Sequence, residues 1–200
     1  MLVLLLLLNP FLFGVNQPFE ERARILLLAT FMYTFLVPML AIGLLLALGF
    51  LSSIQMEDKQ DRTGPYLLTG MLYLWVYYNF LKQGEMPTAY VAFMLGVVIA
   101  LFVAFFINIF SKISIHAVGM GGLVGMVLIT LFRFGPQGVA IPMGGSVVEL
   151  TTLGILFIVI FLAGLVGSCR LLLSAHQPLD LYGGYLVGFL AQVLALTFVF

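Results

Sequence analysis

Charged side chains are scarce in this sequence. Eight Lys and Arg and eight Asp and Glu stand among 200 residues, so charged residues make up 8% of the chain. Soluble domains carry about 25% charged residues, and this chain has too few of them to cover a water-facing surface. An ordinary soluble domain is therefore excluded. The zero net charge also provides no basic field for nucleic acid, so we expect no nucleic-acid partner.

Cysteine and histidine are scarcer still. Cys169 is the one cysteine, which excludes both an internal disulfide and a metal cage built from thiolates. The two histidines, His116 and His176, stand 60 residues apart, each beside a long apolar run. Alternation of apolar and polar residues with a period of two is also missing, which argues against a transmembrane β-barrel.

Apolar residues dominate what is present. The AVILMFWYC set makes up 63% of the chain, and the mean hydropathy is +1.21. A helix needs about 20 apolar residues to cross the hydrocarbon core of a bilayer. The sequence predicts an all-α, polytopic membrane protein, a single membrane domain over residues 1–200 with a bundle of six transmembrane helices over residues 25–200. The predicted spans are residues 25–51, 66–81, 88–110, 114–132, 150–169 and 181–200.

Three other segments need their own interpretation. Residues 1–22 open with a short apolar run that Pro10 interrupts, so we expect an interfacial or re-entrant segment. Residues 135–145 are rich in Gly and Pro, which predicts a turn-rich connection or a re-entrant loop. Glycines recur at residues 119–125 and at Gly184 and Gly188, a spacing typical of closely packed membrane helices.

Six spans place the polar connections alternately on two sides of the membrane. We call side A the side that holds the connections after spans 1, 3 and 5, and side B the side that holds the termini and the other connections. Each side carries four Lys and Arg residues. The basic residues of side A stand beside His, Asp or helix-starting Pro, so we interpret them as candidates for a role in a reaction. The side B set then carries the topological signal, which predicts a cytoplasmic side B and an external or periplasmic side A.

Three predicted helices begin on side A. Pro65, Ser114 and Pro178 are typical of the first positions of helices. Free backbone N–H groups and the positive ends of three helix dipoles would meet there beside Lys and Arg side chains. The pattern predicts an anion site, and phosphate is a natural ligand.

Both histidines fall on side A. Asp180 follows His176 by four residues, so its carboxylate can accept a hydrogen bond from one imidazole nitrogen and leave the other free as base or nucleophile. His116, from another helix, supplies the acid that such a reaction needs. Ionisable groups near membrane depth are costly, which favours a functional role for Arg170, His176 and Asp180 together.

These residues resemble the signatures of the type 2 phosphatidic acid phosphatases, integral-membrane lipid phosphatases related to vanadium haloperoxidases. That family carries Lys-x6-Arg-Pro, Pro-Ser-Gly-His and Ser-Arg-x5-His-x3-Asp. Arg170, His176 and Asp180 match the third signature, although Cys169 stands at its serine position. The second keeps its Ser and His in the segment 113–116 but lacks its Pro and Gly. The first is degraded: with Arg62 as its arginine, its lysine and proline positions hold Gln55 and Thr63.

The resemblance implies a metal-independent lipid phosphatase without a cofactor, acting on a phosphomonoester or diphosphate of a lipid through a phosphohistidine. It implies that His176 attacks phosphorus, that Asp180 orients it and that His116 protonates the leaving oxygen. It further implies that Arg170 binds the phosphoryl oxygens, aided by Arg62 and Ser114. Two helpers without a matched family position complete the predicted phosphate-binding set, namely Lys112 and Lys59.

Two other functions stay open. The departures in the first two signatures leave a protein that binds or transports a lipid phosphate without cleaving it, and a structural membrane subunit without a site is the third alternative. The predicted partners are a lipid phosphate substrate and the surrounding membrane lipids. The sequence leaves open the head group, the chain and the oligomeric state. A compact core without added soluble domains favours a bacterial inner membrane.

Overall fold

The computed structural model of the chain describes residues 28–53, 56, 60–84, 86–135, 138–143 and 146–199. Within these residues six α-helices and one β-hairpin follow one another along the chain. The first helix runs over Leu28–Ala47. The elements are η2 (Met32–Leu36) and α3 (Val37–Ala47) within that helix, α4 (Thr63–Gln83), α5 (Thr88–Phe110), α6 (Ile115–Phe134), β1 (Gly138–Met143), β2 (Ser146–Thr151), α7 (Thr152–Leu172) and α8 (Pro178–Val199).

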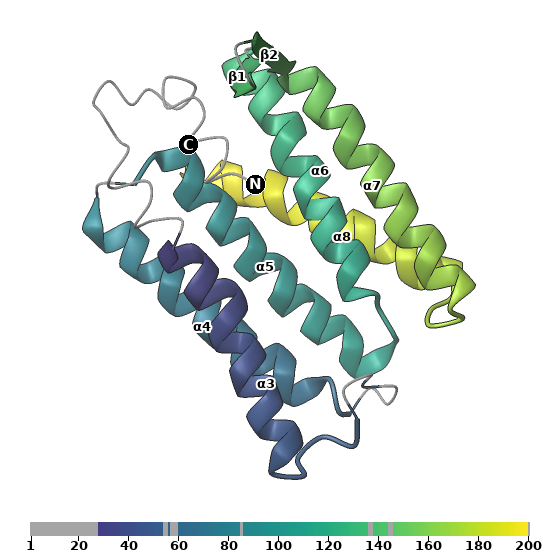
Figure 1. Cartoon of the computed structure of the whole chain (residues 1–200). Coiled ribbons are helices and arrows are strands. Elements are labelled where there is room, and N and C mark those ends of the chain that lie inside the picture. The colour runs from purple at the N-terminus through teal and green to yellow at the C-terminus, as the bar shows by residue number, and fades with distance from the viewer. Residues whose placement is uncertain are drawn as a thin grey trace.

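Five helices are long and apolar enough to cross a membrane, as expected for a polytopic integral membrane protein. They are the helix over Leu28–Ala47 and helices α5, α6, α7 and α8. Helix α4 has 21 residues, which is long enough, but its tyrosines, glycines and polar ends make it less apolar than the others. It nevertheless runs between the same two ends of the bundle (Figure 1).

Local signals in the sequence explain where the helices begin and end. The Ser114 hydroxyl accepts from the Ala117 N–H and starts α6, and the Thr151 hydroxyl accepts from the Gly154 N–H and starts α7. Pro178 is the first residue of α8. Helix α4 ends at Gly84, whose φ of 63° is the left-handed conformation that glycine adopts most easily. The predicted helix starts at Ser114 and Pro178 are confirmed.

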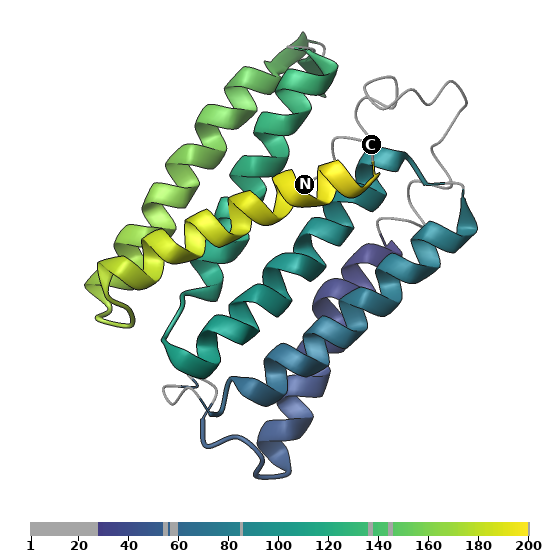
Figure 2. The ribbon, with the colours of Figure 1, turned by 180° about the vertical axis from the view of Figure 1, so that it is seen from behind.

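The helices form an antiparallel bundle crossed by α8. Helices α3, α4, α5, α6 and α7 run roughly along one direction, and α8 lies obliquely across α5 and α6 on one face (Figures 1 and 2). Helix α4 packs between the first helix and α5, and α7 packs on α6. The connections before α4, α6 and α8 lie at one end of this arrangement, as the alternation of spans predicted.

Helices α6 and α8 pack backbone against backbone through glycines. A Cβ on Gly184 would lie 2.8 Å from the Ser114 carbonyl oxygen, and one on Gly188 would lie 2.6 Å from the Gly122 nitrogen and collide with the Val118 carbonyl. Gly121 of α6 meets the backbone of α8 in the same way. The predicted small-residue packing is therefore confirmed.

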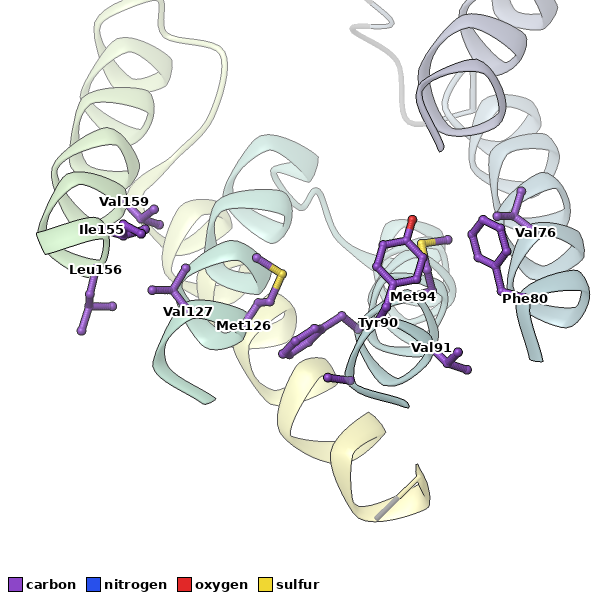
Figure 3. Packing of buried hydrophobic residues seen from close by; sticks show 12 residues of the cluster. Val76, Phe80, Tyr90, Val91, Met94, Met126, Val127, Ile155, Leu156 and Val159 are labelled. Atoms are coloured by element: carbon purple, nitrogen blue, oxygen red, sulfur yellow. The ribbon is translucent and has the colours of Figure 1, made fainter. Parts of the chain in front are cut away.

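The largest apolar cluster fills the side B half of the bundle. Val76 and Phe80 of α4, Ala89, Tyr90, Val91, Phe93 and Met94 of α5, Met126 and Val127 of α6, and Ile155, Leu156 and Val159 of α7 make up this cluster (Figure 3). The rings of Phe80 and Tyr90 meet edge to face at 5.4 Å between centroids. The cluster joins the side B ends of α4, α5, α6 and α7.

A proline in the first helix creates an attachment point for α4. Pro38 has no N–H, so the Thr34 carbonyl four residues earlier lacks its usual helical donor. The helix is π-helical over Met32–Leu36 at this point. The Tyr73 hydroxyl of α4 donates to the Thr34 carbonyl at 2.6 Å and satisfies it. The first helix is thereby joined to α4 by a hydrogen bond between spans.

Between α6 and α7 the chain forms an antiparallel hairpin rather than a loop without regular structure. Strand β1 pairs with β2 from Gly138 with Thr151 to Met143 with Ser146. The sequence analysis predicted a turn-rich connection or re-entrant loop over residues 135–145. The strands flank Gly144 and Gly145 in the sequence, a two-residue hairpin signal that a search for long spans passes over. Residues 1–22, predicted to be interfacial or re-entrant, lie outside the described residues.

Candidate functional site

The side A connections bring residues from four helices around one cavity. Its volume is about 370 Å³, and Arg62, His116, Arg170 and His176 supply its charged and imidazole lining. These residues come from the start of α4, the first turn of α6, the last turn of α7 and the connection to α8. The other lining residues are Ile42, Met56, Pro65, Tyr66, Thr69, Tyr73, Leu101, Ile113 and Ile115. Four residues that the sequence singled out thus share one apolar cavity.

Arg170 stands in the last turn of α7, where its backbone carbonyl accepts from the Ala175 N–H at 3.2 Å. Its Nε is buried and has no hydrogen-bond partner among the described residues. A buried donor without an acceptor is costly. Because this guanidinium lines the cavity, an anion bound there would supply the acceptor that Nε lacks.

Arg62 lines the same cavity from the start of α4. It is the residue that precedes the first turn of α4, and its Nε donates to the Met56 carbonyl at 2.8 Å. This hydrogen bond uses one of the five N–H donors of the guanidinium and leaves the terminal nitrogens for a ligand. The cavity therefore has a cation on each side.

His176 lies in the connection between α7 and α8 and is 9% exposed. Its Nδ1 faces the Asp180 Oδ2 at 3.4 Å, a long hydrogen bond, so Nε2 is the nitrogen left for other partners. The same Oδ2 accepts from the Gln177 N–H at 3.1 Å, which caps the start of α8. Asp180 itself is not among the residues that line the cavity. The carboxylate therefore fixes both the helix start and the imidazole beside it.

Burial lowers the pKa of His176 below its usual value of 6.5. The hydrogen bond and the negative charge of Asp180 act in the opposite direction, while the positive charges of Arg170 and Arg62 add to the lowering. The lowering effects are the larger, so the imidazole is neutral at pH 7. A neutral imidazole with a free nitrogen beside two guanidinium groups is suited to attack an electrophile that carries negative charge.

His116 and Ser114 start α6 but differ in what they reach. The His116 side chain is exposed and lines the cavity. Ser114 is buried, its hydroxyl accepts from the Ala117 N–H at 3.5 Å, and its own N–H donates to the Asp180 carbonyl at 3.3 Å. Ser114 does not line the cavity. Its hydroxyl caps the helix that presents His116, and its backbone ties α6 to the first turn of α8.

Of the two predicted lysine helpers, the structure describes Lys112 alone. Lys112 is exposed in the short connection between α5 and α6 and is absent from the cavity wall. Lys59 lies outside the described residues. The cavity brings together Arg62, His116, Arg170 and His176 of the predicted set, with Asp180 and Ser114 behind them.

The α4 wall of the cavity was not predicted from the sequence. Tyr66, Thr69 and Tyr73 line it, and the spacing of three and four residues between them places them on one face of α4. Tyr73 was not among the predicted site residues. On the same helix Trp75 and Tyr78 are exposed, and Tyr77 packs on the apolar cluster. The polar spacing along α4 was the signal that could have distinguished Tyr73.

Among the described residues, no three His, Cys, Asp or Glu side chains are grouped so that they could hold a metal ion. No protein-family model, curated protein or solved structure matches this chain.

Proposed function

We propose that the chain is a metal-independent integral-membrane phosphatase that hydrolyses a phosphomonoester or diphosphate on a lipid through a phosphohistidine. The observation that carries this proposal is the shared cavity, in which two imidazoles meet an Arg170 whose buried Nε has no acceptor among the described residues. The resemblance of Arg170, His176 and Asp180 to the third signature of the type 2 phosphatidic acid phosphatases supports it independently.

In the first step the Nε2 lone pair of His176 attacks phosphorus. The P–Nε2 bond forms while the bond between phosphorus and the lipid oxygen breaks, and the electron pair of that bond leaves with the oxygen. His116 in its protonated form donates a proton to this oxygen, so the product is a neutral lipid alcohol. Asp180 holds the Nδ1 proton and stabilises the positive charge that develops on the phosphorylated ring.

In the second step water attacks the phosphorus of the phosphohistidine. The neutral His116 left by the first step accepts a proton from this water, the P–Nε2 bond breaks, and its electron pair returns to His176. Inorganic phosphate leaves and both histidines regain their starting states. Arg170 and Arg62 would bind the phosphoryl oxygens in both steps, where their charge opposes the charge spread over those oxygens in the transition state.

The apolar lining supports a lipid rather than a soluble phosphate ester. Ile42, Leu101, Ile113 and Ile115 surround the charged groups, and the cavity is built from helices with the length and composition of membrane spans. A lipid with its phosphate at the membrane surface and its hydrocarbon chain below would match both the charged groups and the apolar lining. We further propose a bacterial inner membrane, with the cavity on the external or periplasmic side A.

Phosphate release by the purified protein tests the proposal. The wild type, His176→Ala and His116→Ala would be assayed in detergent, with chelator, on alkyl phosphates, diacylglycerol phosphate and a polyprenyl diphosphate. Lys82→Gln is a control, because Lys82 is exposed in the last turn of α4, at the other end of the helix from Arg62. We expect chelator-resistant release that falls to background in His176→Ala and about 10²–10⁴-fold in His116→Ala. A phosphate-labelled substrate should leave an acid-labile phosphoryl group on the wild type and none on His176→Ala.

Two outcomes would contradict the proposal. Phosphate release that persists in His176→Ala would exclude His176 as the nucleophile. Phosphate release that chelator abolishes would assign the reaction to a metal ion. Folded wild type that binds lipid phosphates with no turnover on any substrate would instead favour the second function, binding or transport without cleavage. The long distance of 3.4 Å between His176 Nδ1 and Asp180 Oδ2 is the feature that would then count for that alternative.

A further inference from the structure

A second cavity adjoins the first one deeper in the bundle. Its volume is about 300 Å³, and it shares the lining residues Tyr73, Leu101 and Ile115 with the cavity that holds the histidines. Elsewhere its wall consists of apolar side chains and glycines of α5 and α6, with one exception, Gln192 of α8. This shape and composition suit the hydrocarbon chain of a lipid whose phosphate occupies the first cavity.

Gln192 is an unusual residue to find at this depth. It is 3% exposed, and its Oε1 is buried without a hydrogen-bond partner in the described part of the chain. A buried carboxamide oxygen without a donor between apolar helices is unfavourable. A ligand with a hydroxyl group would offer this carboxamide a partner.

The neighbouring helices leave room for this carboxamide. A Cβ on Gly96 of α5 would lie 2.6 Å from the Gln192 Cδ, and Gly122 and Gly125 of α6 would place a Cβ 3.5 Å from its Nε2 and 3.4 Å from its Cβ. Glycines on two helices thus surround the side chain. Gly122 and Gly125 stand six and nine residues beyond His116 along α6, which corresponds to about 9–14 Å.

We infer that the second cavity holds the chain of the lipid phosphate, and that the Gln192 carboxamide forms a hydrogen bond with a hydroxyl on that chain. The hydroxyl would stand about 9–14 Å from the phosphate. The inference rests on the proposed function and sharpens it, because it selects lipid phosphates with a polar group part-way along the chain over those with a plain hydrocarbon chain.

Synthetic alkyl phosphates test this selection directly. Hexadecyl phosphate would be compared with the series of monohydroxy isomers whose hydroxyl moves one carbon at a time along the chain. We expect kcat/KM of the wild type to peak at one or two neighbouring positions, about tenfold above hexadecyl phosphate, the size of effect typical of one buried hydrogen bond. Gln192→Leu, similar in size but unable to accept, should turn over the whole series at one level.

Thr197→Val is the matched control on the same helix. Thr197 is exposed, its hydroxyl donates to the Leu194 carbonyl at 2.7 Å, and it does not line the second cavity. This variant should keep the wild-type peak. Equal kcat/KM for all isomers in the wild type, or a peak in kcat/KM that persists in Gln192→Leu, would overturn the inference. Release of phosphate from every isomer would still support the proposed function.

Failure of the proposed function would give a different result. If no alkyl phosphate is hydrolysed, the same series is measured as equilibrium binding by titration calorimetry. The inference then requires an about tenfold lower Kd for the favoured isomer and loss of that preference in Gln192→Leu. Equal Kd values across the series would overturn it. A glutamine that only stabilises helix packing would change the Tm of Gln192→Leu without changing any preference.

Discussion

The two walls of the histidine cavity are packed in different ways. On one wall, α6 and α8 meet through Gly184 and Gly188, so their backbones touch and little can shift between them. On the other wall, α4 meets α5 through side chains: a Cβ on Gly70 would come only within 3.2 Å of the end of the Phe102 ring. Contacts between backbones are rigid, whereas the end of a side chain can move.

The functional groups are distributed unevenly over these walls. Both histidines and Arg170 belong to the wall of α6, α7 and α8, while Arg62 and Tyr73 belong to the α4 wall. A reaction that breaks a bond needs its nucleophile, acid and charge-stabilising group held within fractions of an ångström. In the proposed reaction, the reacting groups would stand on the rigid wall, and the wall that can adjust would cover the substrate.

Removing one arginine from each wall should give the largest difference. We expect Arg170→Gln to lower kcat/KM for alkyl phosphates by about 10²–10³-fold, because it removes a preorganised donor from the charge that develops in the transition state. Arg62→Gln should cost only about tenfold, since this side chain is partly engaged by the Met56 carbonyl. Steady-state kinetics with Lys82→Gln as the control check this. Equal losses in the two arginine variants would contradict the comparison.

Alanine at one glycine of each wall tests the packing itself. Gly188→Ala would force a methyl group into the α6 backbone, and we expect it to lower the free energy of unfolding by about 3 kcal/mol. Gly70→Ala should change it by less than about 1 kcal/mol, because the Phe102 ring can move and alanine favours the helix.

Denaturation in detergent, followed by circular dichroism, measures these free energies. Gly183→Ala is the control in the same helix as Gly188, since a Cβ there meets nothing within 4 Å. It should leave the protein as stable as the wild type or slightly more so. Comparable losses at Gly70 and Gly188 would show that the two walls are equally rigid.

The pH dependence of kcat/KM tests the role of His176 in the rigid wall. In the proposed mechanism the neutral imidazole is the nucleophile, so we expect kcat/KM to fall as the pH drops through the pKa of His176, which burial holds below 6.5. Asp180→Asn removes the influence that raises this pKa, so the acid limb should move to lower pH. Loss of a hydrogen bond to a charged group should also lower the plateau by about tenfold. Histidine NMR in a His116→Asn background measures the pKa directly, and a limb that moves to higher pH would contradict the assignment.

The smallest expected effect concerns the attachment of α4. Tyr73→Phe leaves the Thr34 carbonyl without a donor, because Pro38 cannot supply one. We expect a loss of about 1 kcal/mol in the free energy of unfolding. Tyr78→Phe, at an exposed position of the same helix, should have no measurable effect. Equal stability of the two variants would show that the hydrogen bond between the helices contributes nothing.

The helix boundaries could be predicted from the sequence because their signals are local. The predicted span over residues 88–110 coincides with α5, and Ser114 and Pro178 begin α6 and α8 as their residue types indicate. The meeting of both histidines and Arg170 followed from the alternation of spans, which needs only a count of crossings. These features depend on chain length and helix termini, and neither requires knowledge of how a helix is rotated about its axis.

Side-chain direction was beyond the sequence. Helix α8 is apolar on nearly every side, so no polar stripe shows which of its faces turns inward, and Gln192 was not identified as a lining residue. On α4 the polar spacing that includes Tyr73 was available but was not used. Ser114 was predicted to help bind phosphate, and the structure shows its hydroxyl capping α6, since an unpaired N–H at a buried helix start is costly. The hairpin β1–β2 was missed because two short strands produce a weaker pattern than a membrane span.

The Asp180 carboxylate has a consequence for how this site can change. One oxygen accepts from the Gln177 N–H, which begins α8, and from the His176 imidazole. Fraying of the first turn of α8 and release of the imidazole are therefore coupled through one oxygen. By thermodynamic linkage, if a ligand that holds the His176 ring against Asp180 also tightens that helical turn, then the tightened turn strengthens the ligand by the same factor.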